Sequence, residues 1–447
     1  MLEILIPDNF IPERSYVIEV IFKEFLGLNY KITVQSDELQ STVICLSDKK
    51  IIFEDHFFSK YSENYLEINN LPQNIIFSQN EFTPESDIPV IYGNSTVEIS
   101  DNYIKCGIDI FSSVFFMLSR WEEYVNPVKD SIGRFPAIAS IAYKNNFLER
   151  PVVNEYVEML WNMLKYYNFQ QERAVKKSEI FLTHDVDVID RPFKGKHAIK
   201  SLLNMFIFDM KLLQSYNKKL HFNIFKFIYN PYDIFDWLLE IVEQNEIKSY
   251  FYFMSDRKTG RDGTYKLDNP LFYKIIKKIE NHKQIIGFHP SFSSFDNAEI
   301  WQQEKQMLEN ALGYSVKEGR QHYLNFSVPL TWQIWEDNKM TADSSCGYAD
   351  KVGFRCGTGD LFSVFNVLTR KKLNLKERPL ILMDSTLTCY LKSSQEENIN
   401  LINKFNNLSE KYNMALTYLT HNTIFHTNKE YFELYLKIIS FMKARLS

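Results

Sequence analysis

The chain of 447 residues lacks several patterns that identify a function directly. Its five cysteines are odd in number and scattered without a CxxC pair, so the sequence predicts neither a disulfide framework nor a thiolate zinc site. It contains no GxGxxG or Walker motif, which argues against a nucleotide-binding open sheet. The 51 basic and 56 acidic residues are interspersed and give a net charge of −5, so we expect no nucleic-acid partner.

Long apolar runs are also missing. No run approaches the roughly 20 residues that span a bilayer, and the first residues are acidic where a signal peptide carries a basic segment. We therefore expect no membrane span and a cytoplasmic protein. What the chain has in abundance is aromatic residues, with 36 Phe and 26 Tyr, and 45% of it is hydrophobic, as in an ordinary globular protein.

The first 178 residues have mixed α and β patterns. Short strand patterns are found at 2–7, 30–35, 41–47 and 49–55. Residues 109–125 and 150–167 place their apolar side chains on one helix face. Residues 168–179 are polar and aperiodic, so we divide the chain there into domains 1–178 and 179–447.

From residue 179 onwards, short apolar strands alternate with amphipathic helices. This alternation favours a parallel sheet, either open or closed into a barrel. Ionisable residues follow the strands, and the active site of a β/α barrel lies at that carboxyl-terminal face. They are Asp185, Asp187, His289, Asp384 and His421. The predicted fold class is therefore α/β, with a (β/α) barrel preceded by a smaller mixed α+β domain.

Asp185 and Asp187 follow one strand and point to the same side of it, since side chains alternate along an extended segment. Two neighbouring carboxylates favour a bound cation, which allows both to stay ionised. His289 is a candidate ligand of the same ion, and His421 a candidate acid or base. Such a set with an open position suits zinc or a similar ion. His184 is a weaker candidate because alternation places it on the opposite face.

Four stretches resemble motifs of the polysaccharide deacetylases with the NodB homology domain (carbohydrate esterase family 4 and relatives). They occur in family order as THDVD (183–187), HPSFS (289–293), RQHY (320–323) and LTH (419–421). The resemblance implies a distorted (β/α) barrel over about 179–447. It also implies metal-dependent removal of N- or O-acetyl groups from a polysaccharide or glycan precursor, with a divalent ion, Zn²⁺ by expectation. Residues 1–178 resemble an uncharacterised domain that precedes such deacetylase domains.

The same resemblance implies a role for individual residues. Asp185 would be the general base, Arg320 would orient it, and His421 would be the general acid. Asp187 and His289 would be metal ligands. The backbone N–H of Tyr323 would contribute to an oxyanion hole. Asp384 is a candidate orienting residue.

Ser293 departs from the family pattern, because it stands where the family has its second metal histidine. A serine hydroxyl is a poor zinc ligand compared with imidazole. Three arrangements are open: the ion held by Asp187, His289 and waters; His322 as a substitute ligand; or a metal-free domain that binds carbohydrate without cleaving it.

Four aromatic residues bear on the non-catalytic alternative. Tyr348 and Phe354 are candidate aromatics of a sugar cleft, whereas Trp332 and Trp335, three apart on a predicted helix, are expected in the core.

A further alternative is that the amino-terminal domain provides specificity by binding a partner or a polymer. The charged residues of SRWEEY (119–124) and DSIGRFP (130–136) could serve there, but we expect them on a solvated face.

Overall fold

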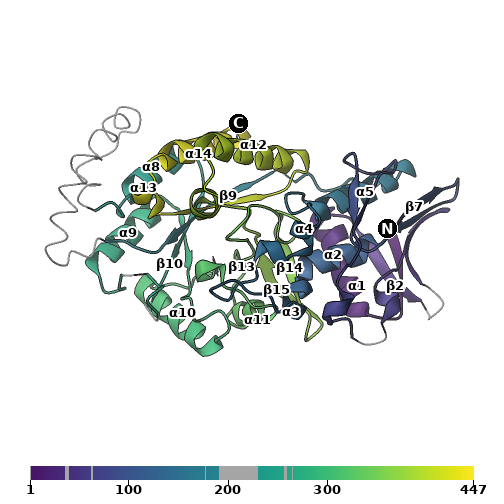
Figure 1. Cartoon of the computed structure of the whole chain (residues 1–447), viewed down its shortest axis with the longest axis horizontal. Helices are drawn as coiled ribbons and strands as arrows, with labels where there is room; N and C mark the ends of the chain where they lie inside the picture. Colours follow the sequence, from purple (N-terminus) through teal and green to yellow (C-terminus); the bar gives the residue numbers. More distant parts are fainter. Residues whose placement is uncertain are drawn as a thin grey trace. The chain divides into compact units, whose positions relative to one another are not determined.

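The structure is a computed structural model that describes residues 2–35, 40–61, 64–176, 178–190, 230–255, 259–263 and 265–446 (Figure 1). Its contacts define two compact units. Unit 1 comprises Met1–Glu179, Leu324–Ile381 and Asn407–Leu416, and unit 2 comprises Ile180–Tyr323, Leu382–Asn406 and Thr417–Ser447. Two segments from the carboxyl-terminal half thus cluster with the amino-terminal residues. The division into contiguous domains 1–178 and 179–447 stays a prediction.

Unit 1 contains a mixed six-stranded sheet in the order β2-β1-β3-β4-β8-β7. Its strands are β1 Leu2–Pro7, β2 Tyr30–Gln35, β3 Ser41–Leu46, β4 Lys49–Glu54, β7 Gly93–Ile99 and β8 Tyr103–Ile108. β1 pairs with β2 and β4 pairs with β8 in parallel, while the other neighbours are antiparallel. The four predicted strands are confirmed, and the mixed α+β class of this part is confirmed with them.

Helices and further short strands complete unit 1. The helices are α1 Ile11–Ile18, η1 Glu19–Phe25, α2 Ile110–Ser119, α3 Trp121–Val125, α4 Ile141–Lys144, α5 Val152–Tyr166 and α11 Leu330–Asp337, with short turns η2 Phe58–Lys60, η3 Ile68–Asn70 and η4 Ala137–Ala139. The remaining strands are β5 Ile76–Ser78, β6 Ile88–Val90, β13 Ala342–Asp343, β14 Phe362–Asn366 and β15 Lys371–Glu377.

The predicted helix 109–125 is broken at Arg120, which has a left-handed backbone with φ 54°. The expectation that SRWEEY is solvated is wrong, because Arg120, Glu122 and Glu123 are all buried. Arg120 Nε donates to Glu123 Oε1 at 2.9 Å, and Arg355 Nε donates to the same oxygen at 2.8 Å. The break therefore turns these charges into the core, where they pair.

The aromatic residues named above are core residues of unit 1. Trp332 and Trp335 are fully buried, as expected. Tyr348 and Phe354 are also buried, so the idea that they line an open sugar cleft is wrong. Arg120 Nη2 donates to Tyr348 Oη at 3.3 Å, which gives this phenol a structural role.

Unit 2 contains the strand row β12-β11-β10-β9-β17-β16. The strands are β9 Ile180–Val186, β10 Ser249–Phe253, β11 Ile285–Phe288, β12 Glu318–Gly319, β16 Leu382–Met383 and β17 Leu416–His421. The pairs β9–β10, β10–β11, β11–β12 and β16–β17 are parallel.

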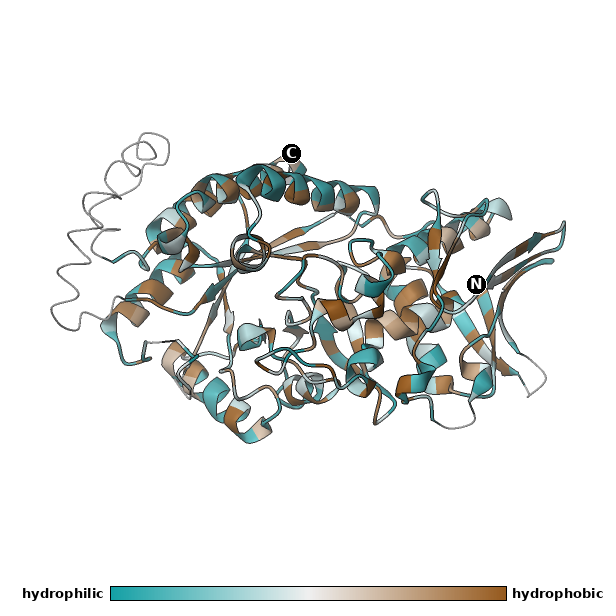
Figure 2. Cartoon of the chain, viewed as in Figure 1, coloured by the Kyte–Doolittle hydropathy of each residue, from teal (hydrophilic) through white to brown (hydrophobic). Residues whose placement is uncertain are grey.

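Helices follow these strands along the chain: α8 Phe235–Gln244, α9 Pro270–Asn281, α10 Ala298–Leu312, η6 Thr386–Tyr390, α12 Gln395–Lys411, α13 Ile424–Thr427 and α14 Tyr431–Leu446. Figure 2 shows brown and teal residues alternating along α12 and α14, as in amphipathic helices. Parallel strands alternating with helices confirm the predicted α/β class. Within the described ranges, no helix combines the length and apolarity needed to cross a membrane.

Candidate metal centre

The carboxyl end of β9 brings the first three candidate residues together. His289, one residue beyond β11, places Nε2 3.7 Å from Asp185 Oδ2 and 3.5 Å from Asp187 Oδ1. Both carboxylates therefore lie on one side of the strand, as side-chain alternation requires. His184 points elsewhere: Nε2 lies 3.0 Å from Tyr435 Oη and its ring stacks on Phe251.

His322 completes the cluster. Its Nε2 lies 3.7 Å from Asp187 Oδ1, and one ligand atom from each of Asp187, His289 and His322 lies within 4.8 Å of the others. Ser293 is half-buried on the turn after β11, and the cluster needs none of its atoms. Of the three arrangements open from the sequence, this geometry favours the one in which His322 is the substitute ligand.

In both His289 and His322, Nδ1 has a hydrogen-bond acceptor outside the cluster. His289 Nδ1 lies 2.6 Å from the Arg320 carbonyl, and His322 Nδ1 lies 3.2 Å from Asp262 Oδ1. A carbonyl or carboxylate at Nδ1 holds a proton there, so in the neutral imidazole the lone pair of Nε2 faces the cluster. Burial lowers the pKa of His289, but Asp185 and Asp187 outweigh burial and raise it, so a metal would bind this imidazole in competition with a proton. Burial also lowers the pKa of His322 on balance, although Asp262 and Asp187 oppose this effect, which favours the neutral ligand form.

The donor atoms fit a divalent ion. Asp187 Oδ1 and His289 Nε2 are buried side-chain atoms without a hydrogen-bond partner. Leaving such atoms unpaired is costly unless something binds them. Burial raises the pKa of Asp187, but the neighbouring His289, His322 and His421 outweigh burial and hold this pKa well below its usual range, so the carboxylate stays charged. One carboxylate and two imidazoles match a catalytic zinc site with open positions.

Asp262 also belongs to the site, although the sequence does not point to it. Its Oδ1 accepts from the backbone N of Phe292 at 2.7 Å, and its Oδ2 accepts from the backbone N of Thr259 at 2.7 Å. Asp262 therefore ties the 259–263 segment to the turn after His289 and to His322. No motif surrounds it, and it lies 60 residues before His322, so no sequence signal would have identified it.

Arg320 and Asp185 form a buried pair beside the cluster. Arg320 Nη1 donates to Asp185 Oδ1 at 2.8 Å, and both side chains are at most 2% exposed. The position of Arg320 depends on Gly319, because a Cβ there would lie 1.9 Å from the Phe288 carbonyl oxygen. β12 can approach β11 this closely only with glycine, and Arg320 follows at once.

His421 and Asp384 form a second pair. Asp384 accepts at Oδ1 from His421 Nδ1 at 2.7 Å and at Oδ2 from His421 backbone N at 2.6 Å. Burial lowers the pKa of His421, but Asp384, with Asp187 and Asp185, outweighs it and raises the pKa to about 10. The imidazole is therefore a cation at neutral pH, able to donate a proton.

Tyr323 lies immediately after His322 with a left-handed backbone, φ 60° and ψ 11°. Its side chain is 39% exposed, and its ring meets Phe292 edge-on at 5.6 Å. The structure thus brings together nine residues: Asp185, Asp187, Asp262, His289, Arg320, His322, Tyr323, Asp384 and His421. The catalytic and ligand roles assigned to them stay predictions.

Comparisons with known proteins find matches to parts of the chain. A model of a family of unknown function, DUF7033, matches residues 2–169, which is less than half of the chain. No curated protein matches the chain. Solved structures resemble a larger share.

A Mycobacterium smegmatis protein assigned as a polysaccharide deacetylase has 14% identity and a TM-score of 0.37 over 59% of this chain and 84% of its own. BA3943 of Bacillus anthracis, a carbohydrate esterase family 4 pseudoenzyme, has 13% identity and a TM-score of 0.27 over 58% of this chain and 62% of its own. The Streptococcus pyogenes deacetylase PplD, in complex with acetate, has 11% identity and a TM-score of 0.24 over 46% of this chain and 94% of its own. Each of these similarities is weak in both sequence and structure. The function therefore has to be inferred from the side chains of the site.

Proposed function

We propose that this chain is a metal-dependent deacetylase that hydrolyses N- or O-acetyl groups on a polysaccharide or glycan precursor. The observation that carries the proposal is the Asp187, His289 and His322 cluster, which lies beside a buried Arg320–Asp185 pair. The cluster offers a metal three donors, and the pair offers a fixed carboxylate within reach of the same imidazole, His289.

Each side chain has a distinct task in this chemistry. A divalent ion such as Zn²⁺ supplies a Lewis acid that polarises an acyl carbonyl and makes water a better nucleophile. Asp185, held by Arg320, accepts a proton from the attacking water. His421, held by Asp384, is charged at neutral pH and donates a proton to the departing amine or alkoxide. The backbone N–H of Tyr323 stays a proposal for the oxyanion hole.

The first experiment tests the metal centre by itself. We expect the full chain to bind Zn²⁺ with a stoichiometry of about one and His322→Ala to lose at least tenfold in affinity, because a ligand matters at least as much as an outer-shell partner. Ser293→Ala, on the turn after His289, is the matched control and should bind as the native chain does. Metal affinity is measured by competition with a chromophoric chelator.

The second experiment tests the chemistry. Acetate release from acetylated chito-oligosaccharides should require added metal and should disappear in Asp185→Asn, which keeps the size of the side chain but removes its basicity. Metal binding without acetate release from any acetylated glycan would contradict the deacetylase proposal. Failure to bind any divalent ion would favour the metal-free carbohydrate-binding alternative instead.

A further inference from the structure

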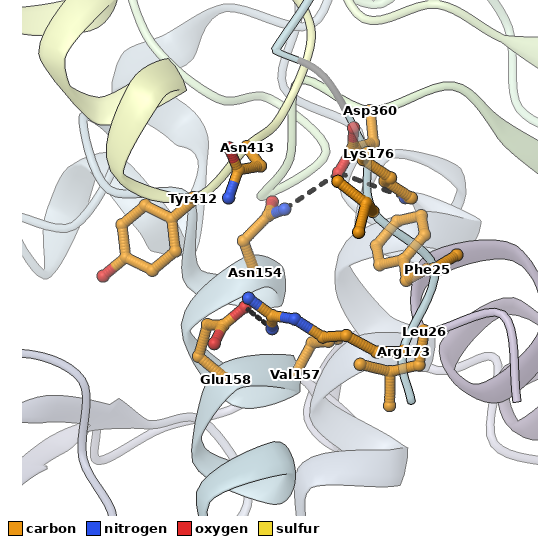
Figure 3. A pocket seen from close by; sticks show the side chains of 12 residues that line it. Phe25, Leu26, Asn154, Val157, Glu158, Arg173, Lys176, Asp360, Tyr412 and Asn413 are labelled. Atoms are coloured by element: carbon orange, nitrogen blue, oxygen red, sulfur yellow. Dashed lines mark hydrogen bonds and ion pairs between the residues drawn. The ribbon is translucent and has the colours of Figure 1, made fainter. Parts of the chain in front are cut away.

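A second candidate site lies in unit 1, in a cavity of about 230 Å³ (Figure 3). One wall is a face of α5, which contributes Asn154, Val157 and Glu158. Residues three and four apart on a helix point the same way, so these three side chains face a common space. Figure 3 shows them opposite residues from four other stretches of the chain, 25–26, 173–176, 360 and 412–413.

The opposite wall is the segment 173–176. This segment packs closely against residues 26 and 27, which hold it in place. Ala174 N donates to the Leu26 carbonyl at 2.8 Å. A Cβ on Gly27 would lie 2.5 Å from Ala174 Cβ, and Gly27 has φ 67°, so only glycine allows this approach. On the remaining side, Ala415 N donates to Asp360 Oδ1 at 3.2 Å. Hydrogen bonds and close contacts within unit 1 therefore hold the walls of the cavity in place.

The charges that line the cavity are balanced. Arg173 Nη1 lies 2.5 Å from Glu158 Oε1, and Lys176 Nζ lies 3.7 Å from Asp360 Oδ2. Each cation therefore faces a carboxylate, and the walls carry no excess of either sign. A phosphate or a polyamine would have to disrupt one of these pairs, whereas a neutral polar ligand would not.

Asn154 supplies an acceptor that lacks a partner. Its side-chain Nδ2 donates to Asp360 Oδ2 at 2.9 Å, which fixes the orientation of the amide. Its Oδ1 is buried and has no hydrogen-bond partner, and the residue is only 6% exposed. A buried acceptor of this kind costs free energy until a donor reaches it, so the site calls for a ligand with hydroxyl or amide donors.

Aromatic rings provide the apolar part. Phe25 lines the cavity with the Lys176 ammonium 4.3 Å from its ring centroid. The Tyr412 hydroxyl bonds Glu85, so Tyr412 lines the cavity with its ring rather than with its oxygen (Figure 3). Apolar rings beside fixed polar groups are the usual composition of a small-molecule site.

We propose that this cavity binds a single ring of a neutral sugar. Hydroxyl groups both donate and accept, so they can satisfy Asn154 Oδ1 and also reach the paired charges, while the C–H face of the ring packs on Phe25 or Tyr412. The volume is below the roughly 300 Å³ at which drug-sized sites begin, which suits one ring rather than a chain of them. The proposal concerns residues outside the metal centre and does not depend on the deacetylase function.

The test is a titration of the full chain with N-acetylglucosamine and, separately, with methyl glucoside. Ligand-observed NMR measures the binding. We expect saturable binding that falls about tenfold in Asn154→Ala, the loss typical of one hydrogen bond in a buried site. Lys176→Met keeps the apolar stem of the side chain but removes the ammonium group. This variant should weaken sugar binding while the hydrogen bond between the sugar and Asn154 Oδ1 remains. Asn162→Ala is the matched control, because this asparagine lies on the same helix and donates to the Phe82 carbonyl instead.

Several outcomes would overturn the proposal. Absence of binding by either neutral sugar at millimolar concentration would do so. Binding that is lost in Asp187→Ala but unchanged in Asn154→Ala and Lys176→Met would place the sugar at the metal centre instead. Preference for glucuronic acid, glucosamine or a free amino acid over the neutral sugars would contradict the argument from balanced charge. Far-ultraviolet circular dichroism of each variant separates lost binding from lost folding.

Discussion

At the scale of single residues, Asp262 connects the metal centre to the rest of unit 2. It accepts from His322 Nδ1 and from two backbone amides, so removing its carboxylate frees the imidazole to rotate. We expect Asp262→Ala to weaken Zn²⁺ binding by about 10- to 100-fold, the usual loss for an outer-shell partner. Chelator competition measures this effect.

Asp262→Asn should retain part of the affinity, since the amide oxygen can still accept from His322. Asp296→Ala, an exposed residue in the segment that precedes α10, is the control and should change nothing. Equal metal affinities for native protein and Asp262→Ala would show that His322 does not depend on this carboxylate. Thermal melting of the metal-free variants checks that the fold is intact.

Asp384 sets the protonation of His421, and its removal gives a pH prediction. The folded pKa of His421 is raised to about 10, so the charged form is lost only as pH rises through that value. Without the Asp384 charge the pKa falls, and we expect Asp384→Asn to move the basic limb of the acetate-release profile to lower pH by roughly one unit or more. Steady-state rates across pH measure the shift.

The same pKa has a consequence for stability. A raised histidine pKa contributes stability that is fully present below the unfolded value of about 6.5 and is lost as pH rises through the folded value. Asp384→Asn should therefore narrow the difference in unfolding free energy between neutral and basic pH. Asp236→Asn, an exposed carboxylate paired with Lys278, is the control. An unshifted activity profile in Asp384→Asn would contradict the assignment of His421 as the acid.

The sequence was informative where chemistry recurs in short motifs. Asp185, Asp187, His289, Arg320 and His421 were each singled out, and the structure places them around one site because parallel strands end at one edge. The charged residues of SRWEEY were misjudged, since charge alone predicts a solvated face and only tertiary pairing with Arg355 reveals burial. The sequence does not reveal the roles of Asp262 and Asn154, because the residues that they contact lie far away in the sequence.

At the scale of elements, the contact between β11 and β12 determines where two site residues lie. A Cβ on Gly319 would collide with the backbone of Phe288. We expect Gly319→Ala to destabilise the fold by about 1–3 kcal/mol, as overpacking does, and to displace Arg320, whose carbonyl holds His289 and whose guanidinium holds Asp185. Denaturant unfolding and Zn²⁺ affinity should therefore both decline.

Gly260→Ala is the control for this change, because no atom lies within 4 Å of a Cβ built there. Retention of native stability in Gly319→Ala would show that β12 can move without consequence. The break at Arg120 was not foreseen, since the apolar period continues through it and only the left-handed backbone interrupts it.

At the scale of the whole molecule, unit 1 is assembled from segments far apart in the chain. Tyr16 Oη donates to the Ser363 carbonyl at 2.8 Å, and its ring lies 4.9 Å from that of Phe365. Glu13 Oε1 accepts from Arg370 Nε at 2.7 Å. Residues 324–381 thus find partners for their buried side chains among the first residues of the chain.

Deletion of residues 1–178 should therefore not leave a well-folded catalytic fragment. The remaining segments 324–381 and 407–416 would expose buried residues of unit 1 such as Phe365 and Leu375. We expect the fragment to aggregate or to bind a hydrophobic dye, whereas the full chain should not. Size-exclusion chromatography distinguishes these outcomes, and a monomeric fragment with native Zn²⁺ affinity would show that residues 179–447 fold by themselves.

The long separation of Tyr16 from its partner Ser363 also determines how long the first residues of the chain wait for that partner during synthesis. The two residues are 347 positions apart, and at roughly 5–20 residues per second a ribosome needs about 20–70 s to make the second after the first. During that interval the apolar face of α1 has no native partner from β14 to cover it. Newly made chains are therefore exposed to misassociation for most of translation, and production of this protein should benefit from slower growth or from chaperones that bind nascent chains.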